Sequence, residues 1–281
     1  MLPVELPADL QAQVARALEE DVGSGDLTAA LVPAGARGKA TVITREPAVI
    51  CGQPWFDACF AWVSPDVVVR WQVAEGDFVK PETLLCEVQG PARALLTGER
   101  SALNFLQLLS GTASLTRRYV DAVAGTFCHI LDTRKTLPGL RRAQKYATRC
   151  GGGHNHRLGL YDAVLIKENH IAAAGSITAA IDAARAQARV LVEVEVETLE
   201  QLDEALSAKP DMILLDNFPL DRLREAVKRA RAAGPQVKLE ASGGVTLENV
   251  RRVAETGVDF ISVGATTKNV QAIDLSMRFE I

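Results

Sequence analysis

The sequence has no apolar run that approaches the roughly 20 residues needed to span a bilayer. Its first ten residues carry two acids and no basic residue, whereas a secretory signal needs a basic start followed by an apolar stretch. The formal net charge of −4 over 281 residues is too small to create a field that gathers nucleic acid. These absences argue against a membrane protein, an exported protein and a general nucleic-acid binder, and we expect a cytoplasmic location.

Cysteine is also scarce. The five cysteines are an odd number, and no two are spaced as C-x-x-C: Cys51, Cys59, Cys86, Cys128 and Cys150. We therefore expect neither a disulfide framework nor a structural zinc site, but small buried side chains in a reducing compartment. Gly and Pro are not in excess, and 48% of the residues are hydrophobic. That composition is ordinary for a globular protein with one large core or two modest ones.

The first part of the chain, to about residue 96, mixes short helices with short extended segments. Helices are predicted at residues 8–20 and 54–63, and strands at 39–44, 67–73 and 84–88, with Gly and Pro between them. This pattern predicts an α+β module with an antiparallel sheet.

The second part opens with a long helix from about residue 97, which the pair Ser110-Gly111 could bend. Short apolar strands then alternate with helices. The strands are predicted at 127–131, 163–166, 190–196, 212–215, 237–239 and 260–263, and the helices at 140–149, 177–187, 199–207, 220–233 and 247–255. Such alternation predicts a parallel sheet. No G-x-G-x-x-G follows the first strand, so we favour a barrel over a doubly wound sheet.

Charged residues, or small residues suited to phosphate binding, follow nearly every strand of this second part. Barrel enzymes carry their catalytic residues at these strand ends. Arg134 and Lys135 come directly after a buried strand, where a carboxylate or phosphate ligand explains them better than solvent does. Glu195 and Asp216 end two further strands and are suited to hold Mg²⁺ or ribose hydroxyls, although a strand with one wet face is the alternative. A purely structural barrel gives no reason for this pattern.

Two glycine-containing turns predict a phosphate site. Ser242-Gly243-Gly244 precedes a helix expected to begin near Thr246, and Gly264-Ala265-Thr266 follows the next strand. Small residues let backbone N–H groups approach a phosphate, and a helix N-terminus favours negative charge. Either turn alone could be an ordinary tight turn, but two on successive strand ends favour phosphate.

A loop of three glycines, Gly151 to Gly153, leads into His154, His156 and Arg157. The two histidines could suggest a metal. Hydrogen bonding to an anion or to a loop carbonyl is the better interpretation, because we find no acid near them in the sequence.

Several blocks together resemble the quinolinate phosphoribosyltransferase family. They are residues 98–104, 132–136, 151–159 and 167–170, with Glu195, Asp216-Asn217 and Ser242-Gly243-Gly244. The resemblance covers essentially the whole chain in order and spacing. It implies an N-terminal α/β sandwich joined to an incomplete, seven-stranded α/β barrel, the type II phosphoribosyltransferase fold. We place the boundary between residues 110 and 111, end the barrel near 267, and expect the tail, about 268–281, to return to the first domain.

The resemblance also implies the reaction, in which quinolinate and phosphoribosyl pyrophosphate give nicotinate mononucleotide, CO₂ and pyrophosphate for NAD biosynthesis. The family forms a homodimer, in which Arg100 would reach the partner's active site. The implied quinolinate ligands are Arg134, His156, Arg157 and Lys167. The implied ligands of phosphoribosyl pyrophosphate and Mg²⁺ are Thr133, Lys135, Glu195, Asp216, Ser242, Gly243, Gly244, Gly264, Ala265 and Thr266. Of these, Lys135, Glu195 and Asp216 would be catalytic.

Three alternatives stay open at this stage. A paralogue of the molybdenum-uptake type would share the fold and use another substrate, although the set Arg134, His156, Arg157 and Lys167 suits a dicarboxylate. A barrel aldolase would use Lys167 as a Schiff base. A binding or carrier module would bind anions without turnover and would leave the acids at the strand ends unexplained.

Overall fold

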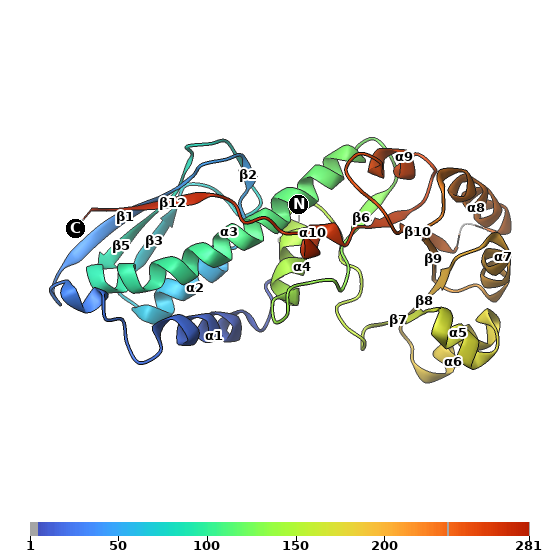
Figure 1. The fold of residues 1–281 in the computed structure, drawn as a ribbon, viewed down its shortest axis with the longest axis horizontal. Coiled ribbons are helices and arrows are strands. Elements are labelled where there is room, and N and C mark those ends of the chain that lie inside the picture. The colour runs from blue at the N-terminus through green and yellow to red at the C-terminus, as the bar shows by residue number, and fades with distance from the viewer. Residues whose placement is uncertain (1–4, 235, 281) are drawn as a thin grey trace. The chain divides into compact units, whose positions relative to one another are not determined.

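The computed structural model describes residues 5–234 and 236–280, which form two compact units (Figure 1). The first unit consists of Met1–Arg117, Thr136–Gly152 and Thr266–Ile281, and the second of Arg118–Lys135 and Gly153–Ala265. The chain thus passes between the units several times, and the boundary expected after residue 110 falls inside one long helix, α3 (Ala92–Ala122). No helix in the described part of the chain could cross a membrane.

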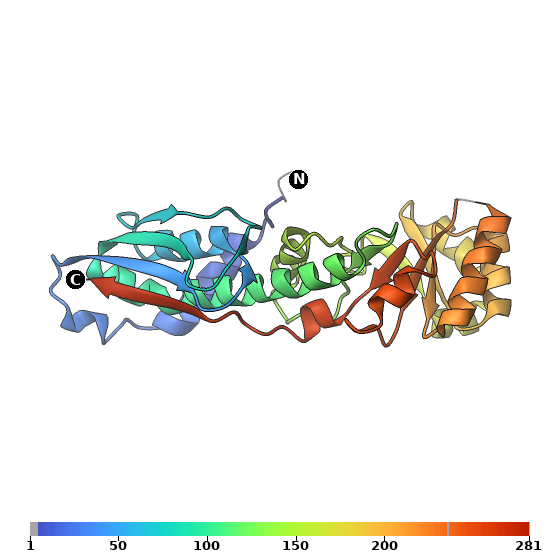
Figure 2. The same cartoon turned by 90° about the horizontal axis from the view of Figure 1, so that it is seen from above.

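The first unit contains an antiparallel sheet with the strand order β12-β1-β5-β3. Its strands are β1 (Arg37–Thr44), β3 (Val68–Trp71), β5 (Leu84–Pro91) and β12 (Leu275–Glu280), and a separate pair is formed by β2 (Ala48–Val49) and β4 (Phe78–Val79). Strand β12, from the end of the sequence, lies along β1 with Val42 opposite Met277 (Figure 2).

The helices of the first unit are α1 (Leu10–Val22), η1 (Ala29–Leu31), α2 (Gln53–Val63), α3, α4 (Arg141–Cys150) and α10 (Ala265–Lys268), the last of which begins at the end of the second unit. Of these, α1, α2, α3 and α4 contribute buried residues to one core with the sheet. Trp55, Phe56 and Phe60 of α2 are buried beside Leu18 of α1. The indole N–H of Trp55 donates to the buried Gln13 side chain at 2.8 Å, so the largest core residue has its polar atom satisfied.

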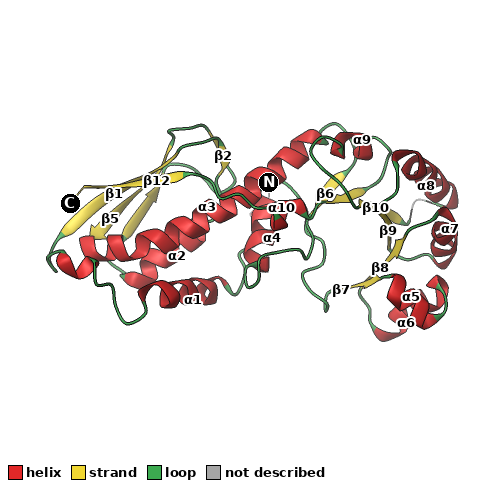
Figure 3. Ribbon diagram, in the orientation of Figure 1, coloured by secondary structure: helices red, strands yellow, loops and turns green. Residues whose placement is uncertain are grey.

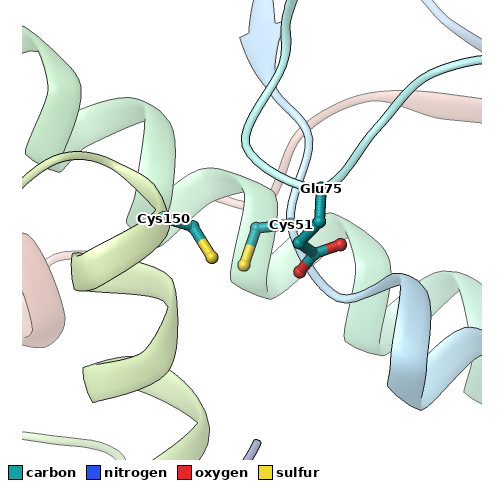
Figure 4. A group of neighbouring side chains, drawn as sticks. All are labelled: Cys51, Glu75 and Cys150. Carbon is teal, nitrogen blue, oxygen red and sulfur yellow. The ribbon is translucent and has the colours of Figure 1, made fainter. Parts of the chain in front are cut away.

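Helix α2 begins at a carboxylate. The two oxygens of Glu75 accept the backbone N–H groups of Gly52 and Gln53 at 2.7 and 3.0 Å. Figure 4 shows the Cys51 and Cys150 thiols facing each other beside this carboxylate. Burial, the neighbouring Cys150 thiol and the charge of Glu75 raise the pKa of Cys51 well above its usual value, so the thiol stays protonated. All five cysteines are buried and free.

Helix α3 runs through Ser110-Gly111 without interruption. Ser110 is buried, and its hydroxyl contacts both the N–H and the carbonyl of Cys51. A Cβ at Gly111 would collide with the backbone carbonyl of Gln271. The small pair therefore allows close packing against two other segments.

The second unit is a parallel sheet with the order β6-β11-β10-β9-β8-β7, and its helices cover one face of the curved sheet (Figure 3). The strands are β6 (His129–Leu131), β7 (Ala163–Ile166), β8 (Leu191–Val196), β9 (Met212–Asp216), β10 (Lys238–Ser242) and β11 (Phe260–Ser262). The helices are α5 (Glu168–Ala174), α6 (Ile177–Gln187), α7 (Leu199–Ala208), α8 (Leu220–Ala233) and α9 (Val250–Ala254).

The predicted class, an antiparallel-sheet domain joined to a parallel-sheet domain, is confirmed. The count of seven strands is not met among the described residues, which form six. The position beside β6 is taken by a single parallel bridge between Leu131 and His154.

Candidate active site

The carboxyl ends of the parallel strands surround a cavity of about 250 Å³ in the second unit. The residues that line it are Thr133, Arg134, Lys135, His156, Arg157, Leu165, Lys167, Glu195, Leu214, Glu240, Ser242 and Ser262. Eight of these were singled out from the sequence as site residues. Period-2 alternation explains the arrangement, since Leu165 and Lys167, or Glu240 and Ser242, point to the same face of their strands.

Two guanidinium groups lie close together in this cavity. Burial and the like charge of Arg134 lower the pKa of Arg157, while the charge of Glu193 opposes that shift. The Arg157 side chain is held by a hydrogen bond from its Nη1 to the carbonyl of Ala163 at 3.2 Å. Two neighbouring positive charges at a partly buried position are stabilised by an anion with more than one oxygen, such as a carboxylate.

Lys167 leaves the end of β7 and meets Glu195 of β8, with Nζ 2.6 Å from Oε2. The Glu195 side chain is 11% exposed and that of Lys167 is 43% exposed. The backbone N–H of Lys167 donates to Nδ1 of His170 at 2.9 Å, which fixes the start of α5. The ammonium group is thus already paired with a carboxylate inside the cavity.

The segment that carries His156 is anchored by a buried acid. Asp132 is fully buried, and its carboxylate accepts the Asn155 side-chain amide at 2.6 Å and the His156 backbone N–H at 2.9 Å. The His156 ring points toward two further buried acids, with Nε2 2.9 Å from Glu193 Oε2 and 3.5 Å from Glu240 Oε2.

These three acids were not singled out from the sequence. Glu193 and Glu240 are 1% and 0% exposed. Burial, the charge of Glu193 and that of Asp132 raise the pKa of Glu240 well above its usual value, and the Ser262 hydroxyl offsets part of this. The sequence does contain an indication of Glu193. Alternation along β8 puts Glu193 on the same face of the strand as Glu195, two residues earlier and therefore farther from the end of the strand.

The turn after β9 packs directly against the turn after β10. The backbone N–H of Asn217 donates to the carbonyl of Ser242 at 2.9 Å, and a Cβ at Gly243 would collide with the Asn217 side chain. Gly243 and Gly244 both have positive φ, at +95° and +60°, and Gly244 has open space beside it. Because these glycines have no side chains, a phosphate can approach the backbone N–H groups of the turn.

Helix α9 starts at Val250, and a turn leads into it from Thr246, whose carbonyl accepts the backbone N–H of Val250 at 2.9 Å. The N–H of Thr246 itself donates to Asn249 Oδ1 at 2.9 Å. That this turn faces a phosphate stays a prediction, and the backbone of the glycine turn is the other candidate donor.

The other candidate phosphate turn lies against the cationic segment. A Cβ at Gly264 would be 3.0 Å from Lys135 Cδ and 3.5 Å from Thr133 Oγ1. Thr133 Oγ1 accepts the N–H of Lys135 at 3.1 Å, so the hydroxyl shapes the turn that presents the lysine. Ala265 is partly exposed and Thr266 is fully buried. The absence of a side chain at Gly264 leaves space for the aliphatic part of the Lys135 side chain.

Arg100 lies on α3 in the first unit, where its side chain is exposed. It is not among the residues that line the cavity of the second unit.

Glu195 and Asp216 are the candidate magnesium ligands. They lie on neighbouring strands, and Glu195 pairs with Leu214, two residues before Asp216, so both carboxylates share one face. Among the described residues, no group of three ligating side chains that includes either acid is close enough to hold an ion. Two carboxylates are enough for Mg²⁺, which prefers oxygen ligands. The remaining positions around this ion are usually occupied by water and by substrate phosphates.

Comparison with known proteins agrees with this geometry. The chain is 48% identical over 271 residues to a nicotinate-nucleotide pyrophosphorylase (carboxylating) of Mycobacterium leprae, which covers 94% of this chain and 95% of that protein. It is 43% identical over 260 residues to a probable enzyme of the same name from Bacillus subtilis, covering 92% and 89%. The structure of the nicotinate-nucleotide pyrophosphorylase from Francisella tularensis superimposes with a TM-score of 0.95 at 43% identity, over 99% and 98% of the chains.

Family models account for nearly the whole length. Residues 26–110 match the N-terminal domain of quinolinate phosphoribosyl transferase, and residues 112–278 match its C-terminal domain. The two matches meet within α3. Together with the relatives, they show that the chain belongs to the quinolinate phosphoribosyltransferase family.

Proposed function

We propose that this chain transfers a phosphoribosyl group to quinolinate and releases CO₂ and pyrophosphate, giving nicotinate mononucleotide for NAD biosynthesis. The observation that carries the proposal is the cavity at the strand ends, which Arg134 and Arg157 both line and in which Lys167 is paired with Glu195. A pyridine with two adjacent carboxylates supplies the negative charge that this arrangement favours.

We assign the phosphorylated substrate to Lys135 and to the turns that follow β10 and β11. Lys135 and the turns at Ser242-Gly243-Gly244 and Gly264-Ala265-Thr266 would bind the phosphate groups through one ammonium and several backbone N–H groups. Thr133 would hold the lysine turn in place. Glu195 and Asp216 would accept ribose hydroxyls and, with the substrate phosphates, hold Mg²⁺, which supplies positive charge to the departing pyrophosphate.

The reaction needs little proton transfer from the protein. The pyridine nitrogen attacks the anomeric carbon while the bond from that carbon to the pyrophosphate oxygen breaks, and Lys135 stabilises the negative charge that leaves. The bond from ring carbon 2 to its carboxylate then breaks, CO₂ departs, and the electron pair stays on the carbon beside the cationic nitrogen. A proton from water completes nicotinate mononucleotide. The cations of the cavity fit this charge flow, in which no protein nucleophile takes part.

A homodimer with shared sites and a cytoplasmic location belong to the same proposal. The exposed Arg100 on α3 would serve the partner's cavity. Large exposed apolar side chains, Leu27, Leu31 and Phe78, offer surface that an oligomer could cover. Five buried, free thiols suit a reducing compartment.

The test is direct. The purified protein is incubated with Mg²⁺, phosphoribosyl pyrophosphate and either quinolinate or nicotinate, and nicotinate mononucleotide is measured by chromatography. Product from quinolinate alone supports both the reaction and the need for the second carboxylate. A folded protein that forms no product from quinolinate would overturn the proposal and point to the substrates of a paralogue.

A further inference from the structure

Three side chains that can ligate a metal meet inside the first unit: Cys51, Glu75 and Cys150 (Figure 4). The two sulfur atoms and one carboxylate oxygen all lie within 4.8 Å of one another. The two cysteines are 0% and 6% exposed, and Glu75 is partly buried. Packing in an apolar core accounts for a buried thiol, but not for a carboxylate placed against two of them.

Hydrogen bonds hold the first two of these ligands in place. The backbone N–H of Cys51 donates to the Ser110 hydroxyl at 2.9 Å, and this hydroxyl donates to the Cys51 carbonyl at 3.1 Å. The Glu75 carboxylate accepts the backbone N–H groups of Gly52 and Gln53 at 2.7 and 3.0 Å. Metal sites in proteins depend on such outer hydrogen bonds, because they orient the ligands before the ion binds.

Close packing positions the third ligand. Cys150 is the last residue of α4, and a Cβ at the following Gly151 would collide with the Ala113 carbonyl of α3. The loop that carries Glu75 lies on the same end of α4, since a Cβ at Gly76 would be 3.6 Å from the Cys150 carbonyl. The three ligands therefore come from segments whose backbones are in contact.

The separations of the ligand atoms suit a tetrahedral ion. Zinc binds sulfur at about 2.3 Å and carboxylate oxygen at about 2.1 Å, which places neighbouring ligand atoms about 3.6–3.8 Å apart. Small side-chain rotations reach this arrangement from the observed separations of at most 4.8 Å. Burial, the Cys150 thiol and the charge of Glu75 raise the pKa of Cys51. A cation among the three ligands reverses that effect, because it stabilises thiolates.

We propose that Cys51, Glu75 and Cys150 form a binding site for a thiophilic divalent cation, with Zn²⁺ as its occupant. Each thiol that binds the ion releases its proton, so two thiolates and one carboxylate surround it. The second oxygen of Glu75 or a water completes four ligands. Mg²⁺ and Ca²⁺ prefer oxygen ligands and do not suit this set. The site would join the start of α2, the loop before β4 and the end of α4, and it is independent of the proposed reaction.

The sequence argued against zinc because it has no closely spaced cysteines. Here folding brings together Cys51 and Cys150 from distant segments, which local spacing does not show. A disulfide is the alternative chemistry for the same two thiols. It needs an oxidant, such as a peroxide, to reach a sulfur atom, and both sulfurs belong to buried residues. A cation can bind while the chain folds, before its ligands are buried.

The test uses Co²⁺, which occupies tetrahedral zinc sites and gives a strong near-ultraviolet absorption when thiolates bind it. The full-length protein is unfolded with a chelator and a reductant, freed of both chelator and metal, and refolded with increasing Co²⁺. We expect a thiolate absorption that reaches its maximum at one ion per chain and disappears when Zn²⁺ displaces Co²⁺. An ion bound only by oxygen or nitrogen ligands elsewhere in the chain gives no such absorption.

Variants assign the absorption to residues. Cys51→Ala and Cys150→Ala should each bind Co²⁺ about 100-fold more weakly or worse, since loss of an outer hydrogen bond alone costs about 10–100-fold. Glu75→Gln should keep the thiolate absorption and bind less tightly than the parent. Cys59→Ala is the matched control, because Cys59 is another buried, free thiol of the first unit and lies outside the cluster.

The parent protein decides the question even if a variant does not fold. Folded parent protein that gives no thiolate absorption with Co²⁺ would overturn the proposal. So would an absorption that is unchanged in both Cys51→Ala and Cys150→Ala. A disulfide between Cys51 and Cys150, found by mass spectrometry in protein purified without reductant and alkylated on unfolding, would assign the pair to oxidation and would also overturn it.

Discussion

Arg134 lines the cavity together with Arg157, and its planar guanidinium can hold both oxygens of one carboxylate. Arg134→Lys keeps the charge and removes that two-point contact. We expect the quinolinate KM to rise about tenfold or more, which corresponds to about 1.4 kcal/mol. Steady-state kinetics would check this, with Arg224→Lys as the control, since Arg224 is exposed and paired with Asp221. An unchanged KM would place the carboxylates elsewhere.

Glu240 predicts a pH-dependent effect on stability. Its pKa in the folded protein lies well above the usual 4.5, because it is buried beside Glu193. Above pH 4.5 the unfolded chain loses this proton while the folded protein keeps it, so the free energy of unfolding falls as pH rises. A glutamine at this position does not titrate, so Glu240→Gln removes this contribution to the pH dependence of the free energy of unfolding.

The Glu240→Gln variant should therefore gain stability relative to the parent between pH 4.5 and 8, by up to about 1.4 kcal/mol per pH unit. Denaturant unfolding at pH 5, 6.5 and 8 would measure the difference. A gap that stays constant over this range would mean that Glu240 ionises in the folded protein as it does in the unfolded chain.

The sequence could reveal the strand-end residues but not the layer beneath them. Lys167, Glu195 and Ser242 each follow an apolar run directly, so the barrel rule locates them. Glu193 and Glu240 lie inside strands, where a charged residue usually indicates a wet face. Only the pairing of β8, β9 and β10 shows that these acids meet beneath His156.

At the level of the helices, Gly111 gives an unusual prediction. Replacing an exposed helical glycine with alanine normally stabilises a helix by up to about 1 kcal/mol. Here the added Cβ would collide with the Gln271 carbonyl, so Gly111→Ala should destabilise by about 1–3 kcal/mol. Thermal unfolding would show the sign, with Ser101→Ala on the same helix as a control for propensity. A higher melting temperature would contradict the close contact.

Long apolar or periodic segments were the elements that the sequence located well. The predictions for β7, α6 and α8 agree with their observed bounds. Elements whose stability comes from a distant partner were missed. Strand β12 has no strong pattern of its own and exists because β1 pairs with it, and no helix was predicted for α5, whose first three residues are polar. The residue pattern of a short segment does not show whether a distant segment will stabilise it.

At the scale of the whole molecule, the proposed shared site can be tested by mixing two inactive chains. Arg100→Ala should abolish activity without dissociating the dimer, and Lys135→Ala should be inactive through its own cavity. Heterodimers of the two carry one intact site, so random exchange should restore up to about a quarter of the normal activity, as closed twofold symmetry requires. Exchange confirmed by tagged subunits, with no activity regained, would count against a site built across two chains.

The pairing of β12 with β1 joins residues 275–280 to residues 39–44, more than 230 positions earlier in the sequence. On a ribosome, which synthesises the chain from its N-terminus, β1 therefore emerges long before its neighbour exists. All segments of the second unit precede β12, so that unit can complete its parallel sheet while the first unit still has an open edge at β1. An unpaired edge of this kind invites pairing with other chains. The order of synthesis thus makes the first unit the part of this enzyme most dependent on protection while it is being made.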